Sequence, residues 1–254
     1  MMKRFMEKGW RSVVAILLFI VFWESIVRIL NIEEWLLPAP SAIVQELFAV
    51  WPTFHPHLLS TLLLAILGFL IGGLFGLTVA MVLHSFDKVR ETIYPFLILS
   101  QNIPIIVLAP LLVIWFGFGP LPKLIIITIA CFFPITISTL GGLQQTNREL
   151  SHYMLMMGAS KREMFWKLEL PDAIPSMLSG LKIAATYSVM AAVVSEWLGA
   201  QKGIGVFMTI ATSSYKTPRV FVAIIVTMLL SFLFFSFILL LEKLLKRFVV
   251  KGGA

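Results

Sequence analysis

Long apolar runs, separated by short polar segments, dominate the pattern of this 254-residue chain. A helix needs about 20 apolar residues to cross a bilayer. The runs lack the alternation of strands, and lipid requires each element to satisfy its own backbone polar groups, so we predict helices. Six runs are long enough or nearly so: 12–30, 58–83, 93–116, 124–140, 174–198 and 220–241. The predicted fold is therefore an all-α integral membrane protein with six transmembrane helices in one domain, 1–254.

Prolines and glycines give three of these helices a particular character. Pro95, Pro104 and Pro110 lie in the third run and predict a kink, because proline removes a backbone donor. Pro134 lies within the fourth run, which is the shortest. In the second run, four glycines at small-xxx-small spacing predict the close approach of another helix, in the same chain or in a second copy: Gly68, Gly72, Gly73 and Gly76.

The composition supports a membrane protein, because 59% of the residues are hydrophobic and only 13% are charged, against about 25% charged in soluble domains. Of the 20 Lys and Arg residues, 14 fall in the termini and in alternate connections, and 5 fall in the other connections. Positive charge marks cytoplasmic segments. We therefore predict that both termini and segment 141–173 are cytoplasmic. The net charge of +7 then reflects topology and does not indicate nucleic-acid binding.

Polar side chains occur inside two of the predicted spans. Gln101 and Asn102 lie about 12–14 Å along the third helix, close to the middle of the bilayer. Thr186, Tyr187 and Ser188 lie at a similar depth in the fifth helix. Such groups face protein or water. They either line a translocation path or hold the bundle together through interhelical hydrogen bonds.

Two ionisable residues belong to the fifth span. Lys182 lies in its inner third, and we predict that its side chain extends towards the cytoplasm. Glu196 lies near the outer end of the same span. It could bind a cationic group, brace a gate or pair with a lysine of the next connection, and pairing with Lys202 or Lys216 is the simplest of these explanations.

Short helices are predicted in two outer connections. Ser41 is predicted to cap an amphipathic helix over 41–50, and Glu24 and Arg28 are predicted to pair on one face of the first helix. Residues 206–212 form an apolar helix that is too short to span, so it lies in the interface or dips in and returns. It is either a gate or docking surface, or a simple surface helix.

The cytoplasmic segment predicts two helices around a glycine. Ser160 and Glu163 have the spacing of a capping box, which starts a helix at Lys161 and extends it to Pro171. Gly158 ends the preceding helix, 148–157. Several methionines give the segment a soft apolar surface that suits a partner's groove. The alternative, an amphipathic helix on anionic lipid, does not account for the helix-Gly-helix shape.

Other classes of protein fit this sequence less well. It contains no G-x4-G-K-[ST] stretch, so an ATPase that drives transport would be another polypeptide. An ion-coupled secondary transporter needs intramembrane ionisable groups, and only Glu196 is available. The four histidines are scattered, and His55 with His57 supplies at most two metal ligands; the single Cys131 permits no disulfide within the chain. A membrane scaffold would not require the polar residues at mid-membrane.

Several stretches together carry a resemblance to a known family. They are the glycine stripe at 68–76, LPAPSAIVQEL at 37–47, PLLVIWFGFG at 110–119, MGASKREMFWKLELP at 157–171 and SEWLGAQKGIG at 195–205. The chain resembles the inner-membrane permeases of binding-protein-dependent ABC importers, in the nitrate/taurine/alkanesulfonate branch. The spacing G-x9-L-x-L-P from Gly158 to Pro171 matches the cytoplasmic coupling loop of these permeases. The start of the motif departs from the family, because His152, Tyr153 and Met154 replace the usual acidic-Ala-Ala.

The resemblance implies a type I importer fold and assigns roles to named residues. The coupling loop, 147–171, would dock on a cytoplasmic ATPase dimer that uses ATP, so this chain needs no cofactor of its own. The residues expected to couple to the ATPase are Arg148, Met154, Met156, Met157, Gly158, Ala159, Ser160, Glu163, Leu168, Leu170 and Pro171. The residues expected along the substrate path are Gln101, Asn102, Thr186, Tyr187, Ser188 and Glu196.

The resemblance also implies partners, location and cargo. The expected partners are a second permease copy, an extracytoplasmic substrate-binding protein and the lipid bilayer of a bacterial inner membrane, with no nucleic acid and no enzymatic activity in this chain. The stretch LKIAATYSVMAAVVSEWLGA at 181–200 is most similar to members that import pyrimidine precursors of thiamine. An alkanesulfonate, taurine or nitrate is the alternative cargo.

Overall fold

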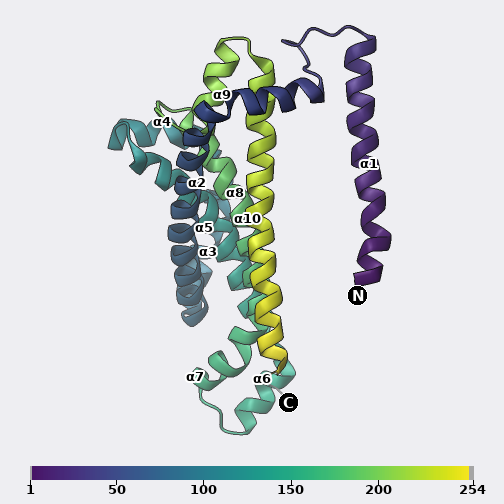
Figure 1. Cartoon of the computed structure of the whole chain (residues 1–254). Helices are drawn as coiled ribbons and strands as arrows, with labels where there is room; N and C mark the ends of the chain where they lie inside the picture. The colour runs from purple at the N-terminus through teal and green to yellow at the C-terminus, as the bar shows by residue number, and fades with distance from the viewer. Residues whose placement is uncertain (1, 252–254) are drawn as a thin grey trace.

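The computed structural model of the protein describes residues 2–251, with the side chains of residues 10–244. All elements of this part of the chain are helices (Figure 1). Five helices are long and apolar enough to cross a membrane, or six if one sharply bent pair forms a single span. The predicted all-α membrane fold is therefore confirmed.

Three helices form the centre of the bundle: α2 (Pro40–Ser85), α5 (Pro120–Gln144) and α8 (Leu170–Glu196). Fully buried residues such as Ala65, Ile127 and Ala184 fill the space between them. The last helix, α10 (Thr217–Lys251), packs against α8 and α2. The helix α5 includes Pro134 without interruption and extends several residues beyond each predicted end.

The glycine stripe packs α2 against α5 of the same chain. A Cβ atom at Gly68 would lie 2.4 Å from Cγ2 of Ile127, and one at Gly72 would lie 2.7 Å from the backbone oxygen of Thr128. Side chains are excluded at both positions, which lets the two helices approach closely. Of the two possibilities that the sequence left open, the structure shows contact within one chain.

The first connection differs from the prediction. The helix α2 begins at Pro40 with Ala39 at its N-cap, so Ser41 is not the cap. Instead, Glu24 of α1 (Met2–Ile29) accepts hydrogen bonds from the Ser41 hydroxyl at 2.7 Å and from the Ser41 backbone N–H at 3.0 Å. Glu24 also pairs with Arg28 at 2.6 Å, as predicted. A carboxylate of the preceding helix thus takes the capping role.

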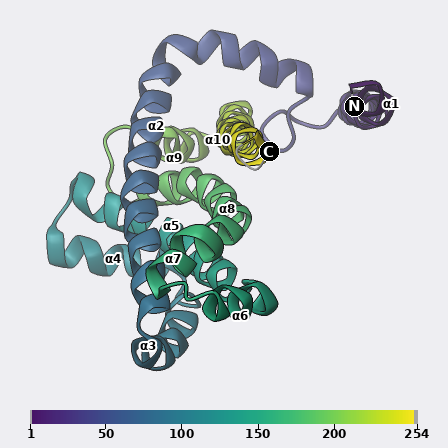
Figure 2. The same ribbon diagram turned by 90° about the horizontal axis from the view of Figure 1, so that it is seen from below.

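The interfacial helix and the second span are one continuous helix. The first part of α2 crosses the end of the bundle, and the rest descends along it (Figures 1 and 2). Pro52 and Pro56 lie inside this helix, and each removes a backbone hydrogen bond that would keep it straight. The helix α1 stands apart from the bundle in both views, although Trp23 contacts Phe221 of α10 with ring centroids 5.6 Å apart.

The third apolar run is two helices rather than one kinked helix. The helices α3 (Asp87–Ser100) and α4 (Ile105–Phe116) meet at 98°. Pro104 has no N–H and disfavours a helical conformation at Ile103, which separates the two. The Asn102 side chain donates to the carbonyl of Ile98 at 2.8 Å, so it satisfies an acceptor that the ended helix leaves free.

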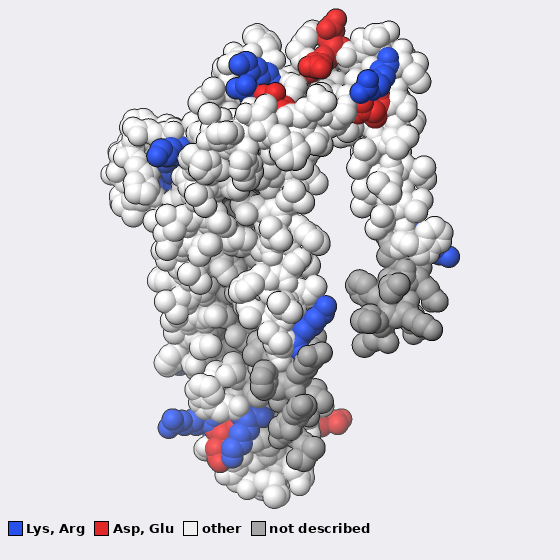
Figure 3. All heavy atoms as spheres, viewed as in Figure 1, with Lys and Arg blue, Asp and Glu red and all other residues white. Residues whose placement is uncertain are grey.

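Two ends of the bundle can be distinguished in Figure 1. The helices α6 (Arg148–Met156) and α7 (Lys161–Met164) lie at one end, which we call the α6 end; α9 (Ile204–Ser213) lies at the other, the α9 end. Charged side chains gather towards these two ends, and most of the surface between them is uncharged (Figure 3). Several basic residues counted above lie outside the described side chains: Lys3, Arg4, Lys8, Lys246, Arg247 and Lys251.

Candidate coupling and translocation sites

The predicted helix-Gly-helix segment is present at the α6 end. Asn147 caps α6, because its side chain accepts hydrogen bonds from the N–H groups of Glu149 and Leu150. Gly158 has a φ of +84°, a conformation that favours glycine and ends the helix. Ser160 and Glu163 form the capping box that starts α7. Local sequence signals therefore shape this segment, as expected.

The second helix of the segment does not end at Pro171. It passes from α7 through a π-helical turn, η1 (Phe165–Glu169), directly into α8. In this turn the N–H of Leu170 donates to the carbonyl of Phe165, five residues back. Pro171 follows in the first turn of α8 and has no N–H to donate to a preceding carbonyl, yet the helix continues through it. The segment and the fifth span are thus one mechanical unit without a loop between them.

The residues predicted to contact an ATPase divide into two groups. Met156 and Met157, at the tip of the segment, are 81% and 71% exposed. Arg148, Gly158, Ser160 and Pro171 are also exposed. Leu168 is buried, and the remaining residues are half-buried: Met154, Ala159, Glu163 and Leu170.

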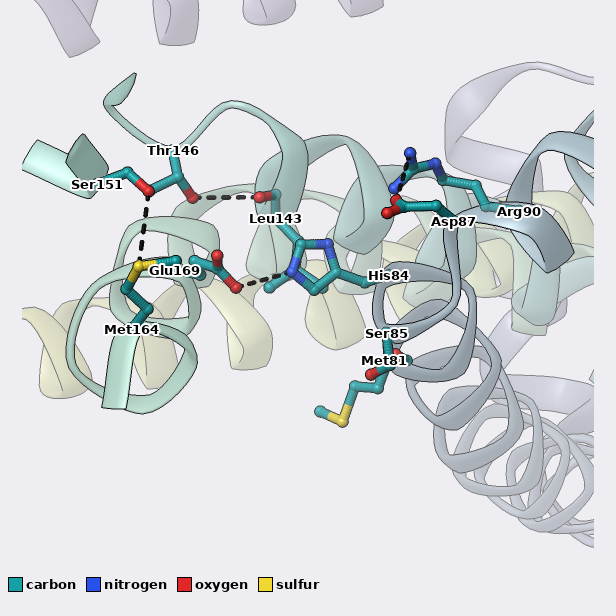
Figure 4. Close-up of polar contacts among 10 residues, drawn as sticks. All are labelled: Met81, His84, Ser85, Asp87, Arg90, Leu143, Thr146, Ser151, Met164 and Glu169. Carbon is teal, nitrogen blue, oxygen red and sulfur yellow. Dashed lines mark hydrogen bonds and ion pairs between the residues drawn. The ribbon is translucent and has the colours of Figure 1, made fainter. Parts of the chain in front are cut away.

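A contact between α2 and the π-turn fixes the coupling segment to the bundle. Figure 4 shows His84, near the end of α2, and Glu169 of η1 pointing towards one another; His84 Nε2 lies 2.8 Å from Glu169 Oε2. Within the segment, the hydroxyl of Ser151 on α6 donates to the sulfur of Met164 on α7 at 3.8 Å. The segment is therefore attached to α2 through Glu169, and its two helices are attached to each other through Ser151 and Met164.

A cavity of about 350 Å³ lies at mid-bundle, between the α3–α4 break, α5 and α8. It brings together three of the predicted path residues, Gln101, Asn102 and Tyr187, and Phe133 contributes an aromatic wall. Tyr187 is 47% exposed and also lines an adjoining apolar cavity of about 230 Å³. That second cavity follows α8 towards the α9 end as far as Val194.

The other polar residues of α8 have different surroundings. The Thr186 hydroxyl donates to the carbonyl of Lys182 at 3.4 Å, and the buried Ser188 hydroxyl donates to the carbonyl of Ala185 at 2.9 Å. Neither lines the described cavities. The Nζ of Lys182 pairs with Glu242 of α10 at 2.9 Å, a partner that the sequence did not predict.

Glu196 is only 1% exposed, and its predicted pairing with Lys202 or Lys216 is wrong. Its carboxylate accepts hydrogen bonds from the Thr61 hydroxyl at 2.7 Å and from the backbone N–H of Gly205 at 2.8 Å. These two donors replace the expected ammonium group. Among the described residues no group of three or more His, Cys, Asp or Glu side chains could hold a metal ion, and His57 instead contacts the backbone of Gly203.

Comparison with known proteins decides the family. Residues 72–247, more than half of the chain, match the model of the binding-protein-dependent transport system inner membrane component. The chain belongs to this family of ABC transporter permeases. The permease is 35% identical to the formylaminopyrimidine transport permease protein ThiX of Halalkalibacterium halodurans, over 94% of this chain and 97% of the relative. Its relatives are transport proteins and not enzymes.

Two further similarities support this assignment. The permease is 31% identical to the putative aliphatic sulfonates transport permease protein SsuC of Bacillus subtilis, over 94% of this chain and 88% of the relative. Its fold is similar to that of an amino acid ABC transporter crystallised with histidines, with a TM-score of 0.67 at 16% identity. That similarity covers 78% of the permease and 97% of the solved chain, and it concerns the fold alone.

The structure adds residues to the candidate sites. Tyr153 and Trp166 expose large aromatic surfaces on the coupling segment, and Phe133 lines the mid-bundle cavity. Tyr153 and Trp166 are large aromatic residues in an otherwise polar segment, and this is the sequence signal that could have found them. The contact between His84 and Glu169 joins positions 85 residues apart, and no local pattern predicts it.

Proposed function

We propose that this chain is the membrane subunit of an ATP-driven importer and that its coupling loop, 147–171, docks on a cytoplasmic ATPase. The family implies an ATPase and a binding protein as partners. The observation that carries the proposal for this chain is the helix-Gly-helix segment itself. It projects from the α6 end, exposes Met156 and Met157 at its tip, and continues into α8 without a loop.

The continuity of the loop with α8 supplies a mechanism. Closure of two ATPases on ATP would push two coupling loops together, and the π-turn would transmit this movement to α8. Because α8 carries Tyr187 at the mid-bundle cavities, a tilt of α8 changes the shape of the path there. In this proposal both termini and the α6 end are cytoplasmic, and the α9 end faces outward.

The proposed cargo is a thiamine pyrimidine precursor. The relative from Halalkalibacterium halodurans carries the name of a formylaminopyrimidine permease. The chemistry of the mid-bundle cavity supports a neutral, planar heterocycle, because two amide side chains and two aromatic rings line it: Gln101, Asn102, Phe133 and Tyr187. Amides match the hydrogen-bonding edge of such a ring, and aromatic side chains stack on its faces.

An alkanesulfonate, taurine or nitrate is the second candidate cargo, because a sulfonate permease of Bacillus subtilis is also a relative. Arginine and lysine are the side chains that suit such anions. Neither residue type occurs among the described residues that line the two mid-bundle cavities. The lining therefore favours the neutral heterocycle.

The proposed assembly contains two copies of the permease. A single chain leaves α1 apart from the bundle and leaves Tyr187 at an open cavity wall, which suits a path formed between two copies. A substrate-binding protein would deliver the cargo at the α9 end. Asn102, Tyr187 and their neighbours would then contact substrate within the membrane, whereas the coupling residues would contact only the ATPase.

Co-purification tests the coupling loop directly. The double variant Met156→Asp/Met157→Asp and the variant Gly158→Pro should each reduce ATPase recovery at least about tenfold, since central interface residues contribute about 2 kcal/mol or more. Membrane insertion should not change, because these residues lie outside the bundle. Val89→Asp provides the matched control, since it adds an acidic group at an exposed apolar position of α3 outside the loop. Full ATPase recovery with either loop variant would overturn the assignment.

A further inference from the structure

A network of side chains fixes the first turn of α9 to two neighbouring helices. The first backbone N–H groups of any helix have no acceptor within that helix. Three successive groups of this kind at the start of α9 donate to side chains instead. The Gly203 N–H donates to His57 Nδ1 at 3.1 Å, the Ile204 N–H donates to the Thr61 hydroxyl at 2.8 Å, and the Gly205 N–H donates to Glu196 at 2.8 Å. Two side chains of α2, which is distant in sequence, and the last residue of α8, Glu196, thus cap α9.

The carboxylate of Glu196 is the centre of this network. It is buried, it forms no ion pair within the described residues, and its second oxygen accepts the Thr61 hydroxyl at 2.7 Å. The ammonium group of Lys123 on α5 attracts it from beyond ion-pair distance. A buried carboxylate is costly unless hydrogen bonds and nearby positive charge stabilise it. The positive end of the α9 dipole contributes to this stabilisation, so the carboxylate and the first turn of α9 hold each other in place.

Close packing makes this connection rigid. A Cβ atom at Gly203 would lie 2.1 Å from Cδ of Glu196, and one at Gly205 would lie 2.2 Å from the carbonyl oxygen of Val193. The first turn of α9 is therefore pressed directly onto the last turn of α8. On its inner face, Phe207 of α9 packs edge-on against Phe54 of α2, with ring centroids 4.9 Å apart.

The position of α9 relates this network to the path. The apolar cavity beside Tyr187 follows α8 through Met190 and Val194 towards the α9 end. Glu196 lies two residues beyond Val194, at the point where α8 stops and α9 is attached. We propose that Glu196 is a positioning residue for transport: its carboxylate makes α9 follow the tilt of α8, so that α9 closes the path at this end.

One element, α8, connects the two ends of the molecule. The coupling segment enters α8 through the π-turn at the α6 end, and the Glu196 network leaves α8 at the α9 end. A movement of the coupling loop then reaches α9 through α8, with no loop between the two ends of this connection. The inference rests on the proposed importer function for its transport readout, but its structural readout does not require an ATPase.

The test measures exposure of the buried face of α9 together with coupling. Ala211 on that face is 3% exposed, so the variant Ala211→Cys can react with an impermeant maleimide only when α9 moves away from the bundle. The native Cys131 is fully buried and should not react. In that background Glu196→Ala should raise the labelling rate roughly 2- to 30-fold, the range expected from loss of a helix N-cap. The variant should also transport less substrate per ATP hydrolysed, while ATPase assembly stays intact.

Three further variants make the test decisive. Glu196→Gln should restore part of the coupling, because its amide oxygen still accepts the Gly205 N–H. Thr61→Val removes one hydrogen bond of the network without changing the size of the side chain, and it should show the same two effects. It therefore keeps the test possible if Glu196→Ala does not fold. Glu46→Ala breaks the pair with Arg219 at the same end without touching α9, and it should change neither measurement.

Unchanged labelling in both Glu196→Ala and Thr61→Val would overturn the inference. So would increased labelling with an unchanged ratio of substrate transported to ATP hydrolysed, because the network would then be merely structural. If the unmodified assembly shows no ATP-dependent uptake, the proposed function fails instead, and the labelling result still shows whether Glu196 holds α9.

Discussion

Gly72 shows how a single residue controls the distance between two central helices. The backbone of α5 lies so near that a Cβ atom at Gly72 would meet the Thr128 oxygen at 2.7 Å. The neighbouring Gly73 has much more room, since its Cβ would lie 3.7 Å from Ile135. The two positions share a helix and a residue type, so they form a matched pair.

We predict opposite effects for alanine at these two positions. Gly72→Ala should lower the free energy of unfolding by about 1–3 kcal/mol, because a methyl group is forced against backbone that cannot rotate away. Gly73→Ala should leave stability unchanged or raise it by up to about 1 kcal/mol, because alanine favours the helix. Thermal unfolding of the purified variants in detergent measures both. Equal losses of stability would show that α2 and α5 do not approach as described.

Residue-scale chemistry was the part least open to prediction from sequence. The sequence shows that Glu196 and Lys182 are charged groups in an apolar run, but it does not show their partners. Thr61 lies 135 residues from Glu196, and Glu242 lies 60 residues from Lys182. No helical periodicity relates such positions. The Glu24–Arg28 pair was predictable because its four-residue spacing fixes the geometry within one helix.

At the scale of elements, α8 connects the features that matter for transport. It begins in the π-turn of the coupling segment, carries Tyr187 at mid-bundle and ends at Glu196. A π-turn inside a helix is rare and is frequently found at functional sites. The pairing of Lys182 with Glu242 holds α8 to α10 between these points. One helix therefore connects the coupling segment, a cavity wall and the network that holds α9.

We predict that the wall of the mid-bundle cavity determines the rate of uptake. Tyr187→Ala and Asn102→Ala should each slow uptake roughly 2- to 10-fold per folded complex, as expected for the loss of one aromatic or amide contact. Assembly with the ATPase should not change. Phe232→Ala, an exposed aromatic position of α10 that lines neither mid-bundle cavity, is the control.

Vesicle uptake normalised to folded complex separates this outcome from a structural role. Lower yield and lower thermal stability, with unchanged uptake per folded molecule, would mean that Tyr187 and Asn102 only hold the bundle together.

The length of the apolar runs and local capping signals predicted which segments are helices, but these signals failed where helices join. The spans and the capped coupling helices follow from hydrophobic length, Gly158 and the Ser160–Glu163 box, all of which are local signals. The continuity of α2 through Pro52 and Pro56, and of α7 into α8 through Pro171, does not follow from them. Prolines normally indicate ends, but tertiary packing tolerates them in these helices.

At the scale of the whole molecule, the arrangement is that of a membrane permease with two different ends. Apolar helices form a body with an uncharged surface, the coupling segment projects at one end, and a tightly anchored short helix lies at the other (Figures 1 and 3). The described structure offers no nucleotide-binding motif, in agreement with the full sequence. In the proposed assembly, the energy for transport comes from an ATPase partner at the exposed coupling segment.

ATP-dependent uptake into proteoliposomes tests the central claim most directly. Vesicles that contain the permease and its ATPase partner, supplied with the binding protein, should accumulate labelled formylaminopyrimidine only when ATP is present on the ATPase side. Accumulation should disappear with the Met156→Asp/Met157→Asp variant and should not respond to a proton or sodium gradient. Accumulation driven by such a gradient without ATP, or unaffected by the loop variant, would contradict the account of an ATP-driven permease coupled through segment 147–171.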